Sequence, residues 1–332
     1  MLILTSLLML LAAADAPARD TMQAIRIHEF GPPSVLRLEE SPRPMKPGDG
    51  EMLLRVHAAA VNPIDWKIRS GRAGKPPLPY TPGFDVSGVV ESVGPNITKF
   101  KAGDAIFAML DLRRGGGYAE YAIVREDEAA PKPSKISHVD AASVPLVTLT
   151  AWQALFDTAK LEKGQSILIH GGAGGVGSAA VQLAKWKGAK VFATASKENL
   201  DFLKQLGADE PIDYQAEKFE DRARNVDVIL DTVGGETQTR SFACLKKAGI
   251  LVSIVGRPSA ELVKQHQVRA EGILVHRSAD ELAQIAALIT DGHFKPVPTQ
   301  IFPLADAAKA HEQSETRHTR GKIVLEVVAA GK

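Results

Sequence analysis

A glycine-rich hexapeptide is the feature of this sequence that most directly indicates chemistry. Residues 172–177 read Gly-Ala-Gly-Gly-Val-Gly, between the strand-like run SILIHG and the helix-like run SAAVQLAKWKG. In such a G-x-G-x-x-G unit the first glycine permits a tight turn, the second lets the backbone approach a pyrophosphate and the third lets helix and strand pack closely. The helix N-terminus then presents unpaired N–H groups to the anion. We predict a dinucleotide contacted by Gly172, Gly174, Gly175, Val176 and Gly177.

The end of the following strand, AKVFATA, indicates which dinucleotide is bound. An NAD site places an acidic residue there, about 20 residues after the glycines, to bind the ribose hydroxyls. Here the strand is followed by Ser196 and Lys197, and the first carboxylate is Glu198. A hydroxyl and an ammonium suit a 2′-phosphate, so we predict NADPH, with Ser196 and Lys197 as its ligands. The alternative is that Lys197 is a solvated lysine at the start of a helix.

The metal-ligating residues form no recognisable site. Nine histidines are scattered through the chain without an H-E-x-x-H pair, and Cys244 is the only cysteine. A catalytic zinc needs three protein ligands and an open fourth position, and a four-cysteine structural site is excluded. We therefore predict no metal. We also expect His170, just before the glycines, to be a structural residue. Asp231 is expected either to line the cofactor cleft or only to cap the turn at Gly234-Gly235.

The elements that must position these residues fall into three stretches. Residues 22–146 contain many short strand-like runs separated by glycine and proline turns, which is typical of a partly open β-barrel. Residues 147–280 alternate apolar strands with helices, the pattern of a doubly wound parallel sheet. The tail, 281–332, holds two further helices and a last strand, GKIVLEV. The predicted fold class is α/β, with two domains.

Length and composition agree with this interpretation. The chain has 332 residues, 45% hydrophobic and 24% charged, which is the mix of a folded protein and excludes disorder and a multi-span membrane protein. The net charge of +1 gives no overall attraction for nucleic acid, so no nucleic-acid partner is expected.

The first 21 residues stand apart from the fold. Residues 2–14, LILTSLLMLLAAA, have the length of a secretory apolar region, and Ala12-Ala13-Ala14 offers a cleavage site. No lysine or arginine precedes the run, and the alternative is a start codon assigned too far upstream, with Met22 as the true first residue. We exclude residues 1–21 from the fold.

Four motifs resemble the medium-chain dehydrogenase/reductase superfamily, and more narrowly its zinc-free quinone oxidoreductase and alkenal/enone reductase branch. They occur in that family's order, from Met22 to the C-terminus: VNPIDWKIRSG (61–71), YTPGFDVSGVVESVG (80–94), LTAWQAL (149–155) and HGGAGGVGSAAVQLAK (170–185). The resemblance implies a GroES-like catalytic domain over 22–146, completed by 281–332, and a Rossmann NADP-binding domain over 147–280. Zinc-dependent relatives carry a cysteine at the position of Asn62 and Gly-His-Glu at 83–85, so both ligands are absent here.

The resemblance also implies roles for residues in the cleft between the two domains. Lys67 is the candidate catalytic donor to the substrate oxygen, although it is otherwise a surface lysine beside Arg69. Asn62 and Thr150 are expected to contact substrate or nicotinamide, and Trp66 to form an apolar wall. Tyr214 matches a position that contacts the adenosine phosphate region in relatives, and the alternative is a core tyrosine with a satisfied hydroxyl.

The expected function is NADPH-dependent, zinc-independent transfer of hydride to the activated C=C of an enone or enal, or to a quinone, with solvent as the default source of the α-carbon proton. The alternative is a non-catalytic NADPH-binding redox sensor or scaffold protein, because fold alone does not establish activity. NADPH is a cytosolic reductant, so we expect a cytoplasmic location in place of export or anchoring through residues 1–21. A strand at 272–276, GILVH, is a candidate edge for a homodimer.

Overall fold

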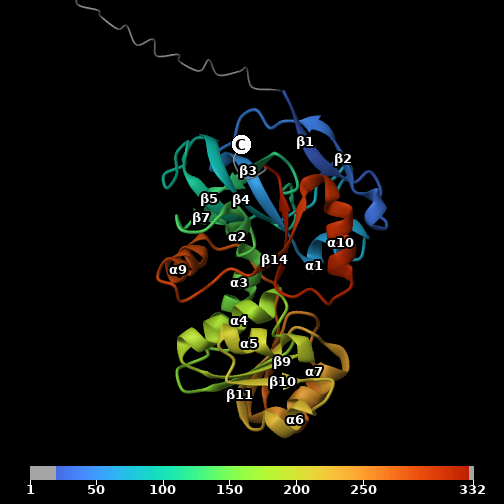
Figure 1. The fold of residues 1–332 in the computed structure, drawn as a ribbon, viewed down its shortest axis with the longest axis vertical. Coiled ribbons are helices and arrows are strands. Elements are labelled where there is room, and N and C mark those ends of the chain that lie inside the picture. The colour runs from blue at the N-terminus through green and yellow to red at the C-terminus, as the bar shows by residue number, and fades with distance from the viewer. Residues whose placement is uncertain (1–19, 329–332) are drawn as a thin grey trace, which may run out of the picture.

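Two large β-sheets form the centres of two lobes of the molecule, as the computed structural model shows (Figure 1). The structure describes residues 20–328, without the side chains of residues 298 and 299. The predicted extension, 1–21, lies outside these residues apart from its last two. The first strand, β1, already begins at Thr21. No helix among the described residues has the length and apolar character needed to cross a membrane.

The upper lobe in Figure 1 is built on a sheet with strand order β14-β15-β3-β4-β5-β7, with β6 paired to β3. All of its pairings are antiparallel except that of β14 with β15. A separate antiparallel pair, β1 and β2, lies in the same lobe. The strands are β1 (Thr21–Arg26), β2 (Arg37–Pro42), β3 (Glu51–Val61), β4 (Asp85–Val93), β5 (Ala105–Met109), β6 (Tyr121–Arg125), β7 (Ala129–Pro131), β14 (Pro298–Pro303) and β15 (Lys322–Glu326).

The C-terminal part of the chain returns to this lobe. Strand β15 pairs with β3 with Ile323 opposite Val61, so residues more than 250 positions apart are neighbours in one sheet. Both strands are almost entirely buried because they lie in the middle of the sheet. The N-terminal lobe is therefore completed by the C-terminal strand.

The lower lobe is a six-stranded parallel sheet in the order β10-β9-β8-β11-β12-β13. This is the 3-2-1-4-5-6 order of a dinucleotide-binding fold, with its switch point between the first strand, β8, and β11. Its central strands, β8 and β11, are mostly apolar and almost entirely buried, as expected for a sheet covered on both faces. The strands are β8 (Ser166–Ile169), β9 (Lys190–Ala195), β10 (Glu210–Asp213), β11 (Val226–Asp231), β12 (Leu245–Ser253) and β13 (Arg269–Gly272).

Helices connect and cover the two sheets. The helix after the glycines, α4, ends where Gly188 takes a left-handed conformation with φ of 87°, which a residue with a Cβ rarely adopts. The next long helix, α9, begins after Ser278, whose hydroxyl accepts from the Glu281 N–H. The α-helices are α1 (Pro63–Arg69), α2 (His138–Ala142), α3 (Pro145–Trp152), α4 (Gly175–Lys187), α5 (Leu200–Leu206), α6 (Phe219–Arg222), α7 (Gly235–Ser241), α8 (Ala260–His266), α9 (Ala279–Thr290) and α10 (Ala307–Glu315).

The structure differs from the sequence expectations at three places. The boundary at 146/147 falls inside α3, and that at 280/281 falls inside α9, because each of these helices continues without a break across the expected boundary. The predicted edge strand at 272–276 is wrong in position, since β13 ends at Gly272. The chain beyond it turns towards α3, where His276 N donates to Gln153 Oε1 at 3.1 Å. The edge strand at this end of the sheet is β13. The homodimer stays a prediction.

Candidate active site

The glycine turn joins β8 to α4, and its glycines are required for different reasons. The positive φ, 61°, falls on Gly171 and not on Gly172, so the predicted role of Gly172 in the turn conformation is corrected. A Cβ on Gly172 would lie 2.9 Å from Leu203 Cδ2 and 3.0 Å from Ala193 Cβ. A Cβ on Gly177 would lie 2.1 Å from Gly171 O, so this close approach of helix and strand tolerates only glycine.

The same turn has space for a side chain at Gly174. A Cβ on Gly174 would meet only Gly171 O, at the ordinary contact distance of 3.4 Å. Gly174, Gly175 and Val176 are all partly exposed, whereas Gly172 and Gly177 are buried. Ser178 N donates to Gly174 O at 2.8 Å, and the N–H groups before it belong to the first turn of a 13-residue helix. The turn therefore offers partly exposed N–H groups and a helix N-terminus to an anion.

Ser196 lies beyond β9, at the carboxyl edge of the parallel sheet. Its hydroxyl donates to Glu198 Oε1 at 2.5 Å and accepts from Asn199 Nδ2 at 3.0 Å. The hydrogen bond from Ser196 holds the pKa of Glu198 below its usual value. This pairing, which was not expected from the sequence, places a carboxylate beside the predicted phosphate ligand.

Lys197 and Tyr214 lie beside Ser196 at this edge. Lys197 is exposed. Tyr214 follows β10 and is half-exposed, with its backbone N–H donating to Ala195 O at 3.2 Å. The alternative of a core tyrosine is therefore wrong. The structure brings Ser196, Lys197 and Tyr214 together at the sheet edge where a dinucleotide's adenosine half binds in this fold.

The side chains of His170 and Asp231 form hydrogen bonds with other groups of the protein. His170 is buried, with Nδ1 3.2 Å from Thr194 Oγ1 and Nε2 2.9 Å from Ser241 Oγ. Asp231 accepts from the N–H groups of Val233 and Gly234 at 3.0 and 2.7 Å, so it caps the turn before α7. Of the two expectations for Asp231, the structure matches the cap.

Burial of His170 predicts a pH dependence of stability. Its pKa is lowered from 6.5 to about 4, mainly because the charged form would be desolvated. Between these two values the unfolded chain binds a proton that the folded chain does not, so stability falls as the pH drops from 6.5 to 4. This residue contributes about 3 kcal/mol to that loss. We expect His170→Gln to show a shallower fall in urea-unfolding free energy over this range, and exposed His293→Gln to match the wild type. Equal slopes for all three chains would contradict the assignment.

Helix α1 carries two of the predicted cleft residues, Trp66 and Lys67, and a third, Asn62, caps its N-terminus. Asp65 Oδ2 accepts from Asn62 N at 2.6 Å and Oδ1 accepts from Gly83 N at 3.2 Å, so one buried carboxylate ties the helix start to the loop before β4. Burial raises the pKa of Asp65 to about 7. Trp66 is buried, and its Nε1 has no hydrogen-bond partner. Lys67 is half-buried, with Nζ 5.6 Å from the centroid of the Trp66 ring.

Asn62 and Thr150 are placed differently from expectation. Asn62 is fully buried, and its amide binds Lys322 Nζ and Asp85 rather than facing an open cavity. Thr150 is buried in α3 and donates to Leu146 O at 2.6 Å, a hydrogen bond within its own helix. Their polar groups are therefore satisfied within the protein.

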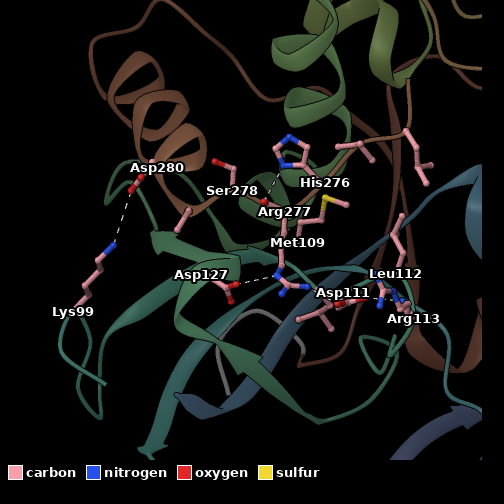
Figure 2. A pocket seen from close by; sticks show the side chains of 14 residues that line it. Lys99, Met109, Asp111, Leu112, Arg113, Asp127, His276, Arg277, Ser278 and Asp280 are labelled. Carbon is pink, nitrogen blue, oxygen red and sulfur yellow. Dashed lines mark hydrogen bonds and ion pairs between the residues drawn. The ribbon is translucent and has the colours of Figure 1, made fainter. Parts of the chain in front are cut away.

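A cavity of about 750 Å³ lies between the loop after β5 and the segment that leads into α9. Apolar side chains of Met109, Leu110 and Leu274 line it. Arg277 lies between Asp111 and Asp127 (Figure 2), with Nε 3.0 Å from Asp127 Oδ2 and an ion pair to Asp111. This cavity could not be predicted from the sequence, because its lining residues come from separate parts of the chain with no recognisable spacing.

A second cavity of about 410 Å³ adjoins the carboxyl ends of β12 and β13, and Leu274 lines both cavities. In a sheet of this topology, ligands bind in the crevice outside the carboxyl ends of the strands. None of the four predicted cleft residues is among the lining residues of these two cavities: Asn62, Trp66, Lys67 and Thr150.

The donor groups at the position of the expected cleft do not suit zinc. Asn62 and Asp85 supply an amide and a carboxylate that already bind a lysine ammonium, and Phe84 is buried and has no donor atom. Within residues 20–328, no three histidine, cysteine or acidic side chains gather closely enough to hold a metal ion. Cys244 is buried, and burial raises its pKa to about 12, so it is not a thiolate ligand at neutral pH.

Comparison with known proteins agrees with this architecture. The sequence model of the alcohol dehydrogenase GroES-like domain matches residues 48–134, and that of a zinc-binding dehydrogenase matches residues 206–325. The chain is 34% identical to the pig (Sus scrofa) quinone oxidoreductase, over 93% of this chain and 99% of that one. It is 36% identical to the chloroplastic NADPH-dependent alkenal/one oxidoreductase of Arabidopsis thaliana, over 94% and 81%. Escherichia coli quinone oxidoreductase complexed with NADPH superposes with a TM-score of 0.84, at 30% identity over 92% and 100%.

The GroES-like lobe completed by the C-terminal strand, together with the parallel sheet and its glycine turn, defines a medium-chain dehydrogenase/reductase. Within that superfamily, the chain belongs to the quinone oxidoreductase and alkenal reductase branch. It is an oxidoreductase, and the predicted family and fold class are confirmed.

Proposed function

We propose that this chain is an NADPH-dependent, zinc-independent reductase of α,β-unsaturated carbonyl compounds or quinones. The observation that carries the proposal is the glycine turn, which is closed to any side chain at Gly177 and open to a ligand at Gly174. The acceptor class comes from the relatives, which are named for quinones and for alkenals and enones.

In this reaction the protein binds the dinucleotide and the acceptor, orients them towards each other and polarises the acceptor. NADPH supplies a hydride when bound, and an enone accepts it at the β-carbon while negative charge moves to the enolate oxygen; water then protonates the α-carbon. The turn at Gly174 and α4 would hold the pyrophosphate. The cavity beside the carboxyl ends of β12 and β13 lies at the sheet edge where this fold binds its dinucleotide, so we assign it to the cofactor and not to the acceptor. We propose Lys67 as the donor that stabilises the enolate oxygen.

Zinc independence rests on the donor set described above. A zinc dehydrogenase uses the ion to polarise a carbonyl. Here an amide and a carboxylate stand where metal ligands would be needed, and an ammonium already binds both. We therefore expect activity to survive prolonged treatment with a strong zinc chelator.

The cofactor preference is assigned to the edge after β9. Lys197→Ala is expected to weaken NADPH binding by about tenfold, because the ammonium makes a charge-assisted contact with the 2′-phosphate. Glu198→Gln is expected to strengthen it, because Glu198 places a carboxylate next to Ser196. Fluorescence titration with NADPH and NADH measures both effects. Equal changes for the two cofactors would contradict the assignment, since NADH lacks the phosphate.

The proposal is tested by cofactor oxidation. The purified chain is mixed with NADPH and either a simple enone or a benzoquinone, with NADH in parallel. We expect turnover with NADPH and much less with NADH. Tight NADPH binding without reduction of either acceptor would overturn the reductase proposal in favour of a sensor or scaffold protein.

We further propose a cytoplasmic location, because NADPH is the cytosolic reductant and a secreted reductase would be separated from it. Mass spectrometry of the native N-terminus tests this. A mature chain that begins at Asp15 or Pro17 would overturn it, because both follow the candidate cleavage site.

A further inference from the structure

Lys322 is a fully enclosed cation at the start of β15. Its side chain is 3% exposed, and its Nζ donates to Val61 O at 2.9 Å and to Asn62 Oδ1 at 2.5 Å. Asp85 Oδ2 lies 3.5 Å from the same ammonium. The ammonium is therefore bound to the last residue of β3, to the N-cap of α1 and to the first residue of β4.

Asp85 extends this network to a second helix. Its Oδ2 accepts from Asn62 Nδ2 at 2.8 Å, and its Oδ1 accepts from Leu146 N, in the first turn of α3, at 2.8 Å. Asp85 is fully buried, so its charge is compensated within the protein by Lys322 and these N–H groups. The network thereby fixes the starts of α1 and α3 relative to each other.

The stem of Lys322 reaches the other lobe. A Cβ on Gly175, the first residue of α4, would lie 3.1 Å from Lys322 Cδ, so the lysine stem runs beside the glycine turn. The preceding residue, Gly321, donates its N–H to Ala173 O at 2.8 Å and pairs with Gly174 in a parallel bridge. One side chain thus contacts both the predicted phosphate-binding turn and the segment that carries Lys67.

We propose that Lys322 is a positioning residue that holds α1 in register with the glycine turn, so that hydride donor and acceptor meet in a reactive geometry. This inference rests on the proposed function. The ammonium of Lys322 binds Val61, Asn62 and Asp85, so we assign Lys322 a role in positioning and not in contact with the reacting atoms. The reaction is sensitive to such positioning because a displacement of about 1 Å costs about a hundredfold in rate.

The test compares Lys322→Met with a matched control, Arg43→Met, in the full-length chain. Arg43 is also a buried cation of the same lobe, but it pairs with Glu91 and stacks on Tyr121, away from α1 and the glycine turn. We expect kcat to fall at least about tenfold in Lys322→Met, with a smaller change in the NADPH dissociation constant. The kinetic isotope effect with 4-deuterated NADPH should rise, because hydride transfer becomes the slow step. Arg43→Met should leave both quantities near the wild type.

A second variant separates positioning from folding. Lys322→Met leaves the Asp85 carboxylate buried without its cation, which destabilises the fold. The double variant Lys322→Met/Asp85→Asn removes both charges and is expected to regain thermal stability while kcat stays low. Recovery of kcat together with stability would overturn the proposal. A fall in kcat no larger than that of Arg43→Met would also overturn it.

Hydrogen exchange gives a readout that does not depend on turnover. We expect amides of 62–69 and 171–178 to exchange faster in the double variant than in the wild type, and to be unchanged in Arg43→Met. If the wild type reduces neither acceptor, the proposed function fails, and the exchange data alone decide the role of Lys322. In that case, exchange rates in 62–69 and 171–178 that are the same in the double variant and the wild type would overturn the positioning role of Lys322.

Discussion

Gly174→Val is expected to abolish NADPH binding while the protein stays folded. A Cβ at this position meets only Gly171 O, at 3.4 Å, so the fold accommodates the new side chain. The valine would, however, project where the pyrophosphate approaches the N–H groups at the start of α4. Loss of those charge-assisted hydrogen bonds corresponds to at least about a hundredfold weaker binding. Fluorescence titration with NADPH measures the binding, and thermal unfolding measures the fold.

Gly177→Val is the contrasting substitution in the same turn. Its Cβ would lie 2.1 Å from Gly171 O and 2.7 Å from Gly172 Cα, both in the rigid backbone of the turn. We expect it to lower the melting temperature or to prevent folding. The assignment of the turn would be contradicted if Gly174→Val bound NADPH like the wild type, because a pyrophosphate on this turn leaves no room for a side chain there.

Lys67→Ala is expected to lower kcat with the enone by about a hundredfold or more, the typical cost of removing one donor from a developing oxyanion. NADPH binding should be largely retained, because Lys67 lies on α1, in the other lobe from the glycine turn. Steady-state turnover and a cofactor titration on the same preparation measure the two effects separately.

Lys75→Ala is the matched control for this substitution. Lys75 follows α1 and lies over an aromatic ring as Lys67 does, with Nζ 6.0 Å from the centroid of Phe30. It is expected to leave kcat unchanged. If Lys67→Ala also left kcat unchanged, Lys67 would have no part in the mechanism, and the surface-lysine alternative would be correct.

The local pattern of the sequence was sufficient to predict the dinucleotide-binding unit. Strand, glycines, helix and second strand follow one another within about thirty residues, so each neighbour in space is also a neighbour in the chain. The tight turn was expected at Gly172, whereas the left-handed residue is Gly171, because either glycine of the pair can take that conformation.

The contacts of Asn62 could not be predicted in the same way. Its amide oxygen binds a lysine 260 residues later, which reaches it only because β15 returns to pair with β3. In the sequence, Lys322 is one more lysine after a glycine. A polar residue at the end of a strand is equally compatible with an open cleft and with an internal network, and the topology decides between them.

The most decisive single measurement follows the hydride itself. The purified chain is incubated with NADPH deuterated at the transferred position of C4 and with a simple enone, and the product is analysed by NMR and mass spectrometry. We predict one deuterium at the β-carbon of a saturated ketone. An alcohol with deuterium on the carbinol carbon would show carbonyl reduction instead, and unchanged enone with tightly bound NADPH would show that the chain is not a reductase of this acceptor class.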